Sequence, residues 1–380
     1  MSAKAAASEA FLPEDWPAAI LVGRIATPPG PSVVLCRGGR LADMSHLTPT
    51  VSALLEVWNG SAPDGRDLGP IGDFDFEAQP LLAPVDLQCV KAAGVTFAVS
   101  AVERVIEERA RGDAARAQAI RDDLRDRVGA DLRSVKPGSD AAMALKQALI
   151  ADGLWSQYLE VAIGPDAEIF TKAPVLSAVG HGAQVGIRSD SAWNNPEPEI
   201  VLVCDGAGHA VGATLGNDVN LRDFEGRSAL LLGKAKDNNA SCALGPFIRL
   251  FDAGFTLDHV RAAQVDLEIV GTDGYRLEGR SSMDQISRDP LELVRQALSE
   301  HQYPDGFALF LGTLFAPVQD RDAPGQGFTH KLGDRVRVAS PLLGVLENEV
   351  TTSKAATPWT FGVGALMRNL AGRGLLGGPQ

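Results

Sequence analysis

The stretch EPEIVLVCDGAGHAVGATLGNDVNLRD (residues 197–223) predicts a β-hairpin, and the rest of the fold is interpreted outward from it. Apolar runs on both sides of the turn signal DGAGH have the pattern of two antiparallel strands. Glu197 and Glu199 lie two residues apart at the start of the first run, so their side chains share one face of the strand. Asp218 lies at the end of the second run.

The symmetry of the hairpin predicts that these three acids lie together. If the strands fold about the central Gly-Ala pair of the turn, Glu197 lies across from Gly216 and Glu199 across from Thr214. Asp218 then shares the face of Gly216 and lies close to Glu197. A bulge in the turn would change this register.

Three carboxylates forced together repel one another and raise each other's pKa, and a divalent cation removes that repulsion. All-oxygen ligation favours a hard ion, Mg²⁺ or in its place Mn²⁺, with water completing the shell. On spacing alone the alternative is that Glu197 and Glu199 are exposed and Asp218 caps a turn. Because Pro196 and Pro198 lack backbone donors, we expect this part of the strand at an edge or mouth of the sheet, which suits an accessible site and a solvated edge equally.

Composition limits the classes of partner. The chain has 380 residues, 45% of them apolar and 22% charged, which is typical of a globular protein. Its net charge of −13 argues against nucleic acid or an anionic membrane as a general partner. No apolar run reaches the ~18 residues of a membrane span, and no signal-peptide pattern opens the chain. The cysteines form no CxxC pair, which argues against structural zinc and predicts a cytoplasmic protein; they are Cys36, Cys89, Cys204 and Cys242.

Changes in composition along the chain predict two domains. Residues 1–82 hold two strand-like runs, a short helix and a connector rich in Gly, Pro and Asp, as expected of a smaller N-terminal α/β domain. Residues 83–380 are β-rich and form the predicted catalytic domain, so that the fold class is α+β. A highly charged helical insert at about 104–152 is interpreted as a solvated helix or a lid.

Short apolar runs and one capped segment give the predicted elements of the second domain. The segment RDPLELVRQALSEH (288–301) is expected to be a helix that begins at its Asp-Pro pair. The expected strands are 158–163, 199–204, 210–215, 229–233, 266–270, 307–315 and 334–340.

Four motifs, in order, resemble those of the fumarylacetoacetate hydrolase superfamily. They are EPE (197–199), NDVNLRD (217–223), GKAKDNNASCALGP (233–246) and LGT (311–313), and the resemblance covers roughly residues 83–350. It implies a mixed β-roll fold for the catalytic domain. It also implies a magnesium ion held by Glu197, Glu199 and Asp218.

The same resemblance implies roles for other residues. Lys236 would lie in the pocket beside the metal as a catalytic residue, where the cation should lower its pKa; the alternative is a surface pair with Asp237. Thr313 resembles the family's contact to the substrate carboxylate. Arg222 holds the place of an arginine four residues after the metal-binding aspartate, with a structural ion pair to Asp223 as the alternative.

The run FTKAPVLSAVGHG (170–182) resembles the family's loop beside the site, so Lys172, His181 and Gly182 are expected to bind substrate. The alternative for His181 is a loop histidine whose ring has its own protein partner.

One departure from the family pattern affects the chemistry. In the hydrolases, a His and a Glu of the segment aligned with GVTFAVSAVE (94–103) activate the attacking water. Here Glu103 remains but Ser100 replaces the His, which argues against hydrolysis of a carbon–carbon bond. Glu103 is therefore the candidate general base, with a solvated position on a charged helix as the alternative, and Ser100 is a candidate hydrogen-bond partner for a substrate hydroxyl.

With its helical insert and N-terminal domain, the chain is most similar to the subgroup that dehydrates 2-keto-3-deoxy sugar acids. The substrate implied is 2-keto-3-deoxy-D-xylonate (2-dehydro-3-deoxy-D-arabinonate), and the product is 2,5-dioxopentanoate. The alternatives are a hydrolase of acylpyruvates or diketo acids, and a non-catalytic protein that binds metal or acids. The family usually assembles at least as dimers, so a homodimer or homotetramer is expected, while the sugar stereochemistry stays open.

Overall fold

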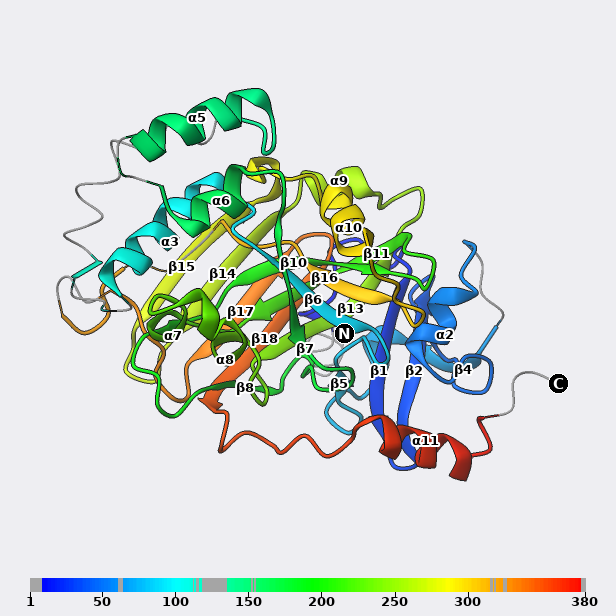
Figure 1. The fold of residues 1–380 in the computed structure, drawn as a ribbon. Coiled ribbons are helices and arrows are strands. Elements are labelled where there is room, and N and C mark those ends of the chain that lie inside the picture. Colours follow the sequence, from blue (N-terminus) through cyan, green and yellow to red (C-terminus); the bar gives the residue numbers. More distant parts are fainter. Residues whose placement is uncertain are drawn as a thin grey trace.

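The computed structural model describes residues 9–60, 64–111, 113, 116–117, 135–151, 153, 155–314, 317, 319–323 and 327–376 (Figure 1). Within these residues, 11 strands form one large sheet. Its order is β4 (Arg66–Pro70), β3 (Arg40–Asp43), β2 (Gly30–Arg37), β1 (Leu21–Thr27), β13 (Cys242–Leu250), β11 (Ala210–Asp218), β10 (Pro198–Cys204), β16 (Phe307–Phe310), β6 (Cys89–Gly94) and β7 (Glu168–Ala173), and β5 (Leu81–Leu82) pairs with β1.

A second sheet packs against the first and encloses the main core. Its order is β15 (Arg276–Ser282), β14 (Gln264–Val270), β17 (Arg335–Ser340), β18 (Gly344–Thr352) and β8 (Gln184–Ile187); β9 (Asn194–Asn195) and β12 (Asn220–Leu221) form a separate pair. Ile200 and Leu202 of β10 share one apolar cluster with Leu267 of β14 and Val338 of β17. Val201 and the other alternate residues of β10 join a different cluster on the opposite face. β10 is therefore buried on both faces, which explains its continuous apolar run.

The hairpin register differs from the symmetric one that we predicted. Glu199 pairs with Gly216, not with Thr214, and the register shifts between Val203 and Cys204 next to the turn. The net shift is two residues, so every side chain stays on its predicted face. Asp218 consequently lies directly across from Glu197, and its N–H donates to the Glu197 carbonyl oxygen over 3.0 Å.

The prediction of a position at an edge or mouth of the sheet holds only for the start of this strand. β10 lies between β11 and β16 in the interior of the large sheet. Pro198 is the first residue of β10, and the pairing with β16 begins only at Val201. The proline therefore needs no partner on the β16 side, and the start of the strand extends past its neighbour.

Two segments that we predicted to be strands are helical. Residues 158–163 lie in α6 (Gln157–Ile163), where the Ser156 side chain caps the first turn by accepting from the Leu159 N–H. Residues 229–233 form a 3₁₀ turn and the start of α8 (Leu232–Lys236), behind a second capping serine, Ser228. In both cases a short apolar run fits either structure, and the serine before it decides for the helix.

The N-terminal strands continue the large sheet. β1 pairs with β2 and also with β13, where Leu21 lies opposite Arg249. The predicted helix of this region is α2 (Val51–Glu56), whose buried face packs on the sheet. The domain boundary at residue 82 stays a prediction, because the pairing of β1 with β13 joins the two parts in one sheet.

Helices α3 (Ala98–Ala110), α5 (Asp140–Ala151) and α6 gather on one side of the molecule, away from α2 and from α11 (Val363–Gly372) (Figure 1). Val105 and Ile106 of α3 pack with Leu149 of α5 and Leu159 of α6 in a small apolar cluster of their own. Much of the predicted insert at 104–152 lies outside the described residues. The part that is described is helical, as expected.

The remaining helices lie between strands. The predicted helix at 288–301 is confirmed as α10 (Pro290–Leu298), which begins at the N-cap Asp289, and the others are α7 (Arg222–Glu225) and α9 (Leu257–Arg261). All four cysteines are free thiols. Among the described residues, none of the helices combines the length and hydropathy that a membrane span requires.

Candidate active site

Glu197, Glu199 and Asp218 meet at one end of the β10–β11 hairpin, as the sequence predicted. Each offers a carboxylate oxygen, and the three oxygens lie within 4.8 Å of one another. All three residues are buried, which excludes the alternative of two exposed glutamates and a turn cap. A compact, all-oxygen donor set of this kind fits a small divalent cation.

Two glycines shape the floor below these acids. Gly216 pairs with Glu199, and a Cβ on Gly216 would lie 2.2 Å from the Phe310 ring. Gly312 has a φ of +88°, which favours glycine, and its N–H donates to Glu199 Oε2 over 2.6 Å. The Glu199 carboxylate is thus fixed from the backbone, with its second oxygen left for another partner.

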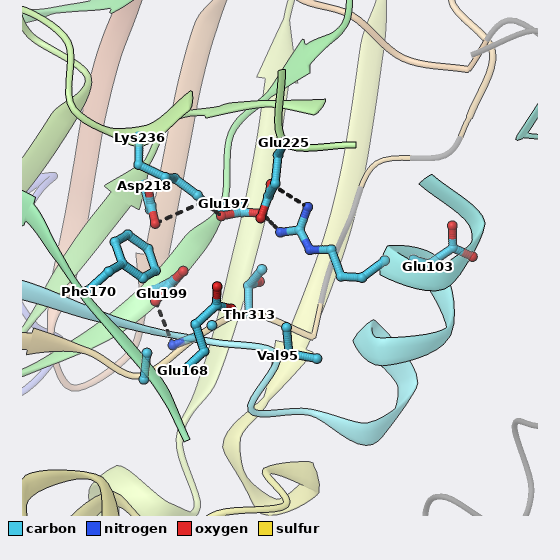
Figure 2. Close-up of a pocket in the computed structure, with 14 residues that line it drawn as sticks. Val95, Glu103, Glu168, Phe170, Glu197, Glu199, Asp218, Glu225, Lys236 and Thr313 are labelled. Carbon is cyan, nitrogen blue, oxygen red and sulfur yellow. Dashed lines mark hydrogen bonds and ion pairs between the residues drawn. The ribbon is translucent and has the colours of Figure 1, made fainter. Parts of the chain in front are cut away.

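Two buried lysines and one partly buried arginine surround the acids. Lys236 Nζ contacts Glu197 Oε2 and lies 3.1 Å from Asp218 Oδ2 (Figure 2). Lys172 Nζ lies 2.7 Å from the other Asp218 oxygen. Arg104 of α3 contacts Glu197 Oε1 through Nη2 and lies 2.9 Å from Glu225 Oε2 through Nη1.

The charges do not balance. The carboxylate of Glu103 also lines the cavity but points away from the acids (Figure 2), and without it five carboxylates face three cations, an excess of two negative charges when all are ionised. The five carboxylates are Glu168, Glu197, Glu199, Asp218 and Glu225, and the three cations are Arg104, Lys172 and Lys236. Burial, followed by the charges of Asp218 and Glu197, holds the pKa of Glu199 well above its usual range. For Glu197 burial opposes ionisation, but Lys236 and Arg104 outweigh it and lower the pKa to about 2. The unmatched charge therefore falls on Glu199, and a divalent cation would cancel it.

Lys236 is held in its charged form. Burial alone would lower the pKa of Lys236, but the carboxylates of Asp218, Glu197 and Glu225 outweigh it and raise the pKa above the usual value. This direction is opposite to the fall that we predicted beside a bound cation. Within the cluster of side chains, Lys236 is therefore a stable ammonium that pairs the acids.

Glu168, the first residue of β7, is a fourth carboxylate of the cavity, and the sequence analysis missed it (Figure 2). It pairs with Gly94 of β6, and a Cβ on Gly94 would lie 2.1 Å from Glu168 Oε2, so the carboxylate fills the space that the glycine leaves. Burial first, and then the charge of Glu225, raise the pKa of Glu168 to about 7. A carboxyl with this pKa can exchange a proton near neutral pH.

The acids line a small cavity of about 30 Å³, which is room for about two water molecules. Its apolar wall includes Val95 and Phe170, and Lys236 Nζ lies 5.9 Å from the centre of the Phe170 ring. Thr313 follows Gly312 at the mouth. The cavity can therefore hold an ion and water, with a mainly polar floor and a partly apolar wall.

Comparisons with known proteins support this assignment of the fold. Residues 156–351, more than half of the chain, match the fumarylacetoacetate (FAA) hydrolase C-terminal family. The chain belongs to the fumarylacetoacetate hydrolase family. Membership in this family confirms the resemblance that the four sequence motifs predicted.

Two curated relatives carry dehydratase names. The chain is 34% identical over 154 residues to 2-dehydro-3-deoxy-D-arabinonate dehydratase of Saccharolobus solfataricus, in an alignment that spans 40% of this chain and only about half (51%) of that protein. It is 27% identical over 267 residues to a probable 2-keto-3-deoxyxylonate dehydratase of Haloferax volcanii, which covers 63% of this chain and 88% of that one.

Solved structures share the fold. The apo form of a 2-keto-3-deoxy-D-arabinonate dehydratase aligns with 87% of this chain and 99% of its own, with a TM-score of 0.64 at 20% identity. The form of that enzyme complexed with magnesium and 2,5-dioxopentanoate has a TM-score of 0.62 over the same shares. The strand-rich α+β fold predicted for this family is confirmed.

Among the predicted site residues of this family member, Lys236 and Thr313 line the cavity together with the three acids. Glu103 also belongs to the wall, but Figure 2 shows its carboxylate pointing away from Glu197, Glu199 and Asp218. The predicted base is therefore aimed less favourably than Glu168. Ser100 lies in α3, and its side chain is outside the described ones.

Four predicted substrate contacts lie elsewhere. Lys172 is fully buried behind Asp218 and absent from the cavity wall, so the structure makes it a partner of that carboxylate. Arg222 Nη1 donates to the Pro317 carbonyl oxygen over 2.9 Å, also away from the wall. The alternative that we predicted for Arg222 was an ion pair with Asp223, but the Asp223 carboxylate accepts from the Ser191 hydroxyl and the Ala192 N–H instead.

His181 and Gly182 line a different cavity, beside Phe11 and Phe76. The His181 Nδ1 accepts from the Glu347 N–H over 3.2 Å, and its ring centroid lies 4.8 Å from that of Phe11. The alternative of a loop histidine with its own protein partner is therefore the better description. Of the described residues of this family loop, Phe170 lines the cavity and Lys172 pairs with Asp218 behind it.

Arg104, Glu168 and Glu225 are the charged wall residues that the sequence analysis missed. Arg104 was one of many charges in a segment that we interpreted as solvated. Glu168 lies at the start of a strand, and Glu225 lies in α7, two residues after the end of the NDVNLRD motif. Of these three residues, Glu225 was the one that the sequence could have indicated, because α7 begins within a motif already assigned to the site.

Proposed function

We propose that this protein is a magnesium-dependent hydro-lyase that dehydrates a 2-keto-3-deoxy pentonate, 2-keto-3-deoxy-D-xylonate, to 2,5-dioxopentanoate. The single observation that carries the proposal is the buried triad of Glu197, Glu199 and Asp218, with two negative charges in excess around it. The names of both curated relatives support the substrate class. Mn²⁺ is the alternative ion, and the assembly into dimers or tetramers stays a prediction.

Overall, the reaction removes a C3 proton and the C4 hydroxyl as water, which leaves a C3–C4 double bond. One proton then moves from C5 to C3, and the proton of the C5 hydroxyl moves to C4, so that the C5 alcohol becomes the aldehyde. A divalent cation on the three acids would supply Lewis-acid polarisation of the C2 carbonyl. The residues of the chain must then move the protons and compensate the charge that develops as the C3 proton leaves.

Glu168 is suited to accept the C3 proton, because it lines the cavity and its pKa is raised to about 7. Lys236 presents an ammonium to the same cavity, where it can stabilise negative charge on the substrate. Thr313 lines the same cavity, and its hydroxyl is suited to donate to the carboxylate of the substrate. Phe170 and Val95 exclude water from one side.

Hydrolysis is less well supported by the site. Among the described residues that line the cavity, none is a histidine, so the imidazole that activates water in the hydrolases has no counterpart there. The non-catalytic alternative conflicts with Glu168, whose pKa near 7 has no structural use.

The direct test is a panel of 2-keto-3-deoxy acids incubated with the purified protein and Mg²⁺. We expect formation of an aldehyde from the pentonate, detected by a coupled aldehyde dehydrogenase, and loss of this activity after treatment with a chelator. Added Mg²⁺ should restore it. Full activity in the chelated protein would contradict the metal assignment, and release of two acid fragments from an acylpyruvate would favour the hydrolase.

The pH dependence of kcat/KM should report Glu168. A base acts only when ionised, so activity should fall about tenfold per pH unit below about pH 7 and become level above it. The measurement is kcat/KM at saturating Mg²⁺ over the pH range in which the protein stays folded. A rising limb near 4.5, the usual pKa of a glutamate, would exclude Glu168 as the base.

A further inference from the structure

We propose that Arg104 occupies the cation's place on Glu197 in the cation-free site and turns to the substrate carboxylate when the site is loaded. This inference deepens the function proposed above and rests on it. Arg104 is thereby a residue that recognises the acid group of the substrate and competes with the metal ion for one oxygen.

The guanidinium of Arg104 is divided between two different carboxylates. Nη2 contacts Glu197 Oε1, a candidate metal ligand, and Nη1 lies 2.9 Å from Glu225 Oε2, which is outside the triad. Arg104 comes from α3, Glu197 from the start of the hairpin and Glu225 from α7. The anchor on Glu225 can therefore persist while the contact with Glu197 changes.

Both oxygens of Glu197 are already in use. Oε2 contacts Lys236, and Oε1 accepts from Asn220 Nδ2 over 3.2 Å in addition to Arg104. A cation gains full access to Glu197 only by displacing one of the two positive groups. Lys236 is held by Asp218 as well, whereas the other anchor of Arg104 lies outside the triad. Arg104 is consequently the group that releases Glu197 at the lower cost.

The released arm has a use, because the substrate is an anion entering a site rich in carboxylates. Of the described wall residues, only Arg104 and Lys236 are cationic, and Lys236 pairs the acids. The planar fork of arginine suits a carboxylate, and Glu225 holds the other half of the fork in place. Since the cavity has room for about two waters, a five-carbon acid requires wall groups to move, and Arg104 is one of these groups.

The experiment measures binding without turnover. Calorimetric titration of Mg²⁺ into the wild-type protein and Arg104→Gln should show about tenfold tighter binding to the variant, since a charge-assisted bond no longer competes. Titration of pyruvate, a simple 2-keto acid, into the Mg²⁺-saturated proteins should show affinity about tenfold or more weaker for the variant. If Arg104 only held α3 in place, its replacement would instead weaken the binding of both Mg²⁺ and pyruvate.

Arg109→Gln is the matched control, because Arg109 lies on the same helix, donates to the Gly153 carbonyl oxygen and is absent from the cavity wall. It should leave both affinities unchanged. Arg104→Lys keeps one charge but not the fork, so we expect intermediate pyruvate affinity, which keeps the test decisive if Arg104→Gln does not fold. Weaker or unchanged Mg²⁺ binding to the Arg104 variants overturns the inference, whereas a wild-type protein that binds no Mg²⁺ overturns the proposed function with it.

Discussion

Replacement of Glu168 by Gln is expected to lower kcat about 10²- to 10⁴-fold while Mg²⁺ binding persists. The amide keeps the shape that fits over Gly94 but cannot accept the C3 proton. The triad itself does not depend on this side chain, because its oxygens are held by Gly312, Lys236 and Lys172. Steady-state kinetics combined with Mg²⁺ titration of the variant would check both parts of this expectation.

Glu103→Gln separates the two candidates for the base. The Glu103 carboxylate points away from the triad, so we expect the Glu103→Gln variant to keep most of its turnover (Figure 2). Glu108→Gln on the same helix, where the side chain accepts from Gln157, is a control for helix α3. An inactive Glu103 variant beside an active Glu168 variant would restore the sequence-based assignment and remove Glu168 from the mechanism.

The triad was predictable from the sequence because it depends on a period of two. Glu197 and Glu199 share a face in any strand, and Asp218 joins them in any register that differs by an even number of residues. The error in the pairing of Glu199 therefore left the cluster intact. Its cause was a shift beside the turn, which depends on local turn geometry and not on the hydrophobic pattern.

The helices that were predicted to be strands show a second limit. A run such as 229–233 has no period that distinguishes a strand from a buried helix, and the capping serine is the stronger signal. The sequence also did not predict that β10 lies inside the sheet. A proline indicates an edge strand where a neighbouring strand would otherwise need its N–H, but β16 pairs with β10 only from Val201 onward and so does not reach Pro198.

The charged residues around the triad were the least predictable part of the site. Arg104 and Glu168 come from α3 and from the start of β7, and only the fold brings them to the acids of the hairpin. No spacing along the chain links a charged helix to a strand end some sixty residues later. Conversely, His181 and Gly182 belong to a segment that matches a family motif, but they line another cavity. The order of the motifs along the chain therefore led us to predict them too close to the site.

Two buried lysines compensate part of the charge of the triad. Lys236 and Lys172 neutralise part of the charge, and each contacts a different oxygen of Asp218. Buried charges of this kind depend on one another, since the removal of one partner leaves the others uncompensated. Asp218 therefore has two separable functions, as a candidate metal ligand and as the counter-ion of two buried lysines.

Asp218→Asn should consequently damage both functions. Mg²⁺ affinity is expected to fall about 100-fold or more, because ligand charge is lost from a three-carboxylate site. The free energy of unfolding without metal should fall by about 3 kcal/mol, because Lys172 loses its carboxylate partner and Lys236 keeps only Glu197. Urea unfolding in chelator gives the second quantity and calorimetric titration the first.

Asp266→Asn is the matched control, since Asp266 is also a strand aspartate in an ion pair, with Arg280, but its side chain is 44% exposed. An exposed pair contributes about 0 to 1 kcal/mol, so this variant should change neither quantity measurably. If Asp218→Asn lost stability but kept its Mg²⁺ affinity, Asp218 would be a counter-ion only. The cation would then have to be held by the two glutamates alone, and the charge argument for a three-acid site would fail.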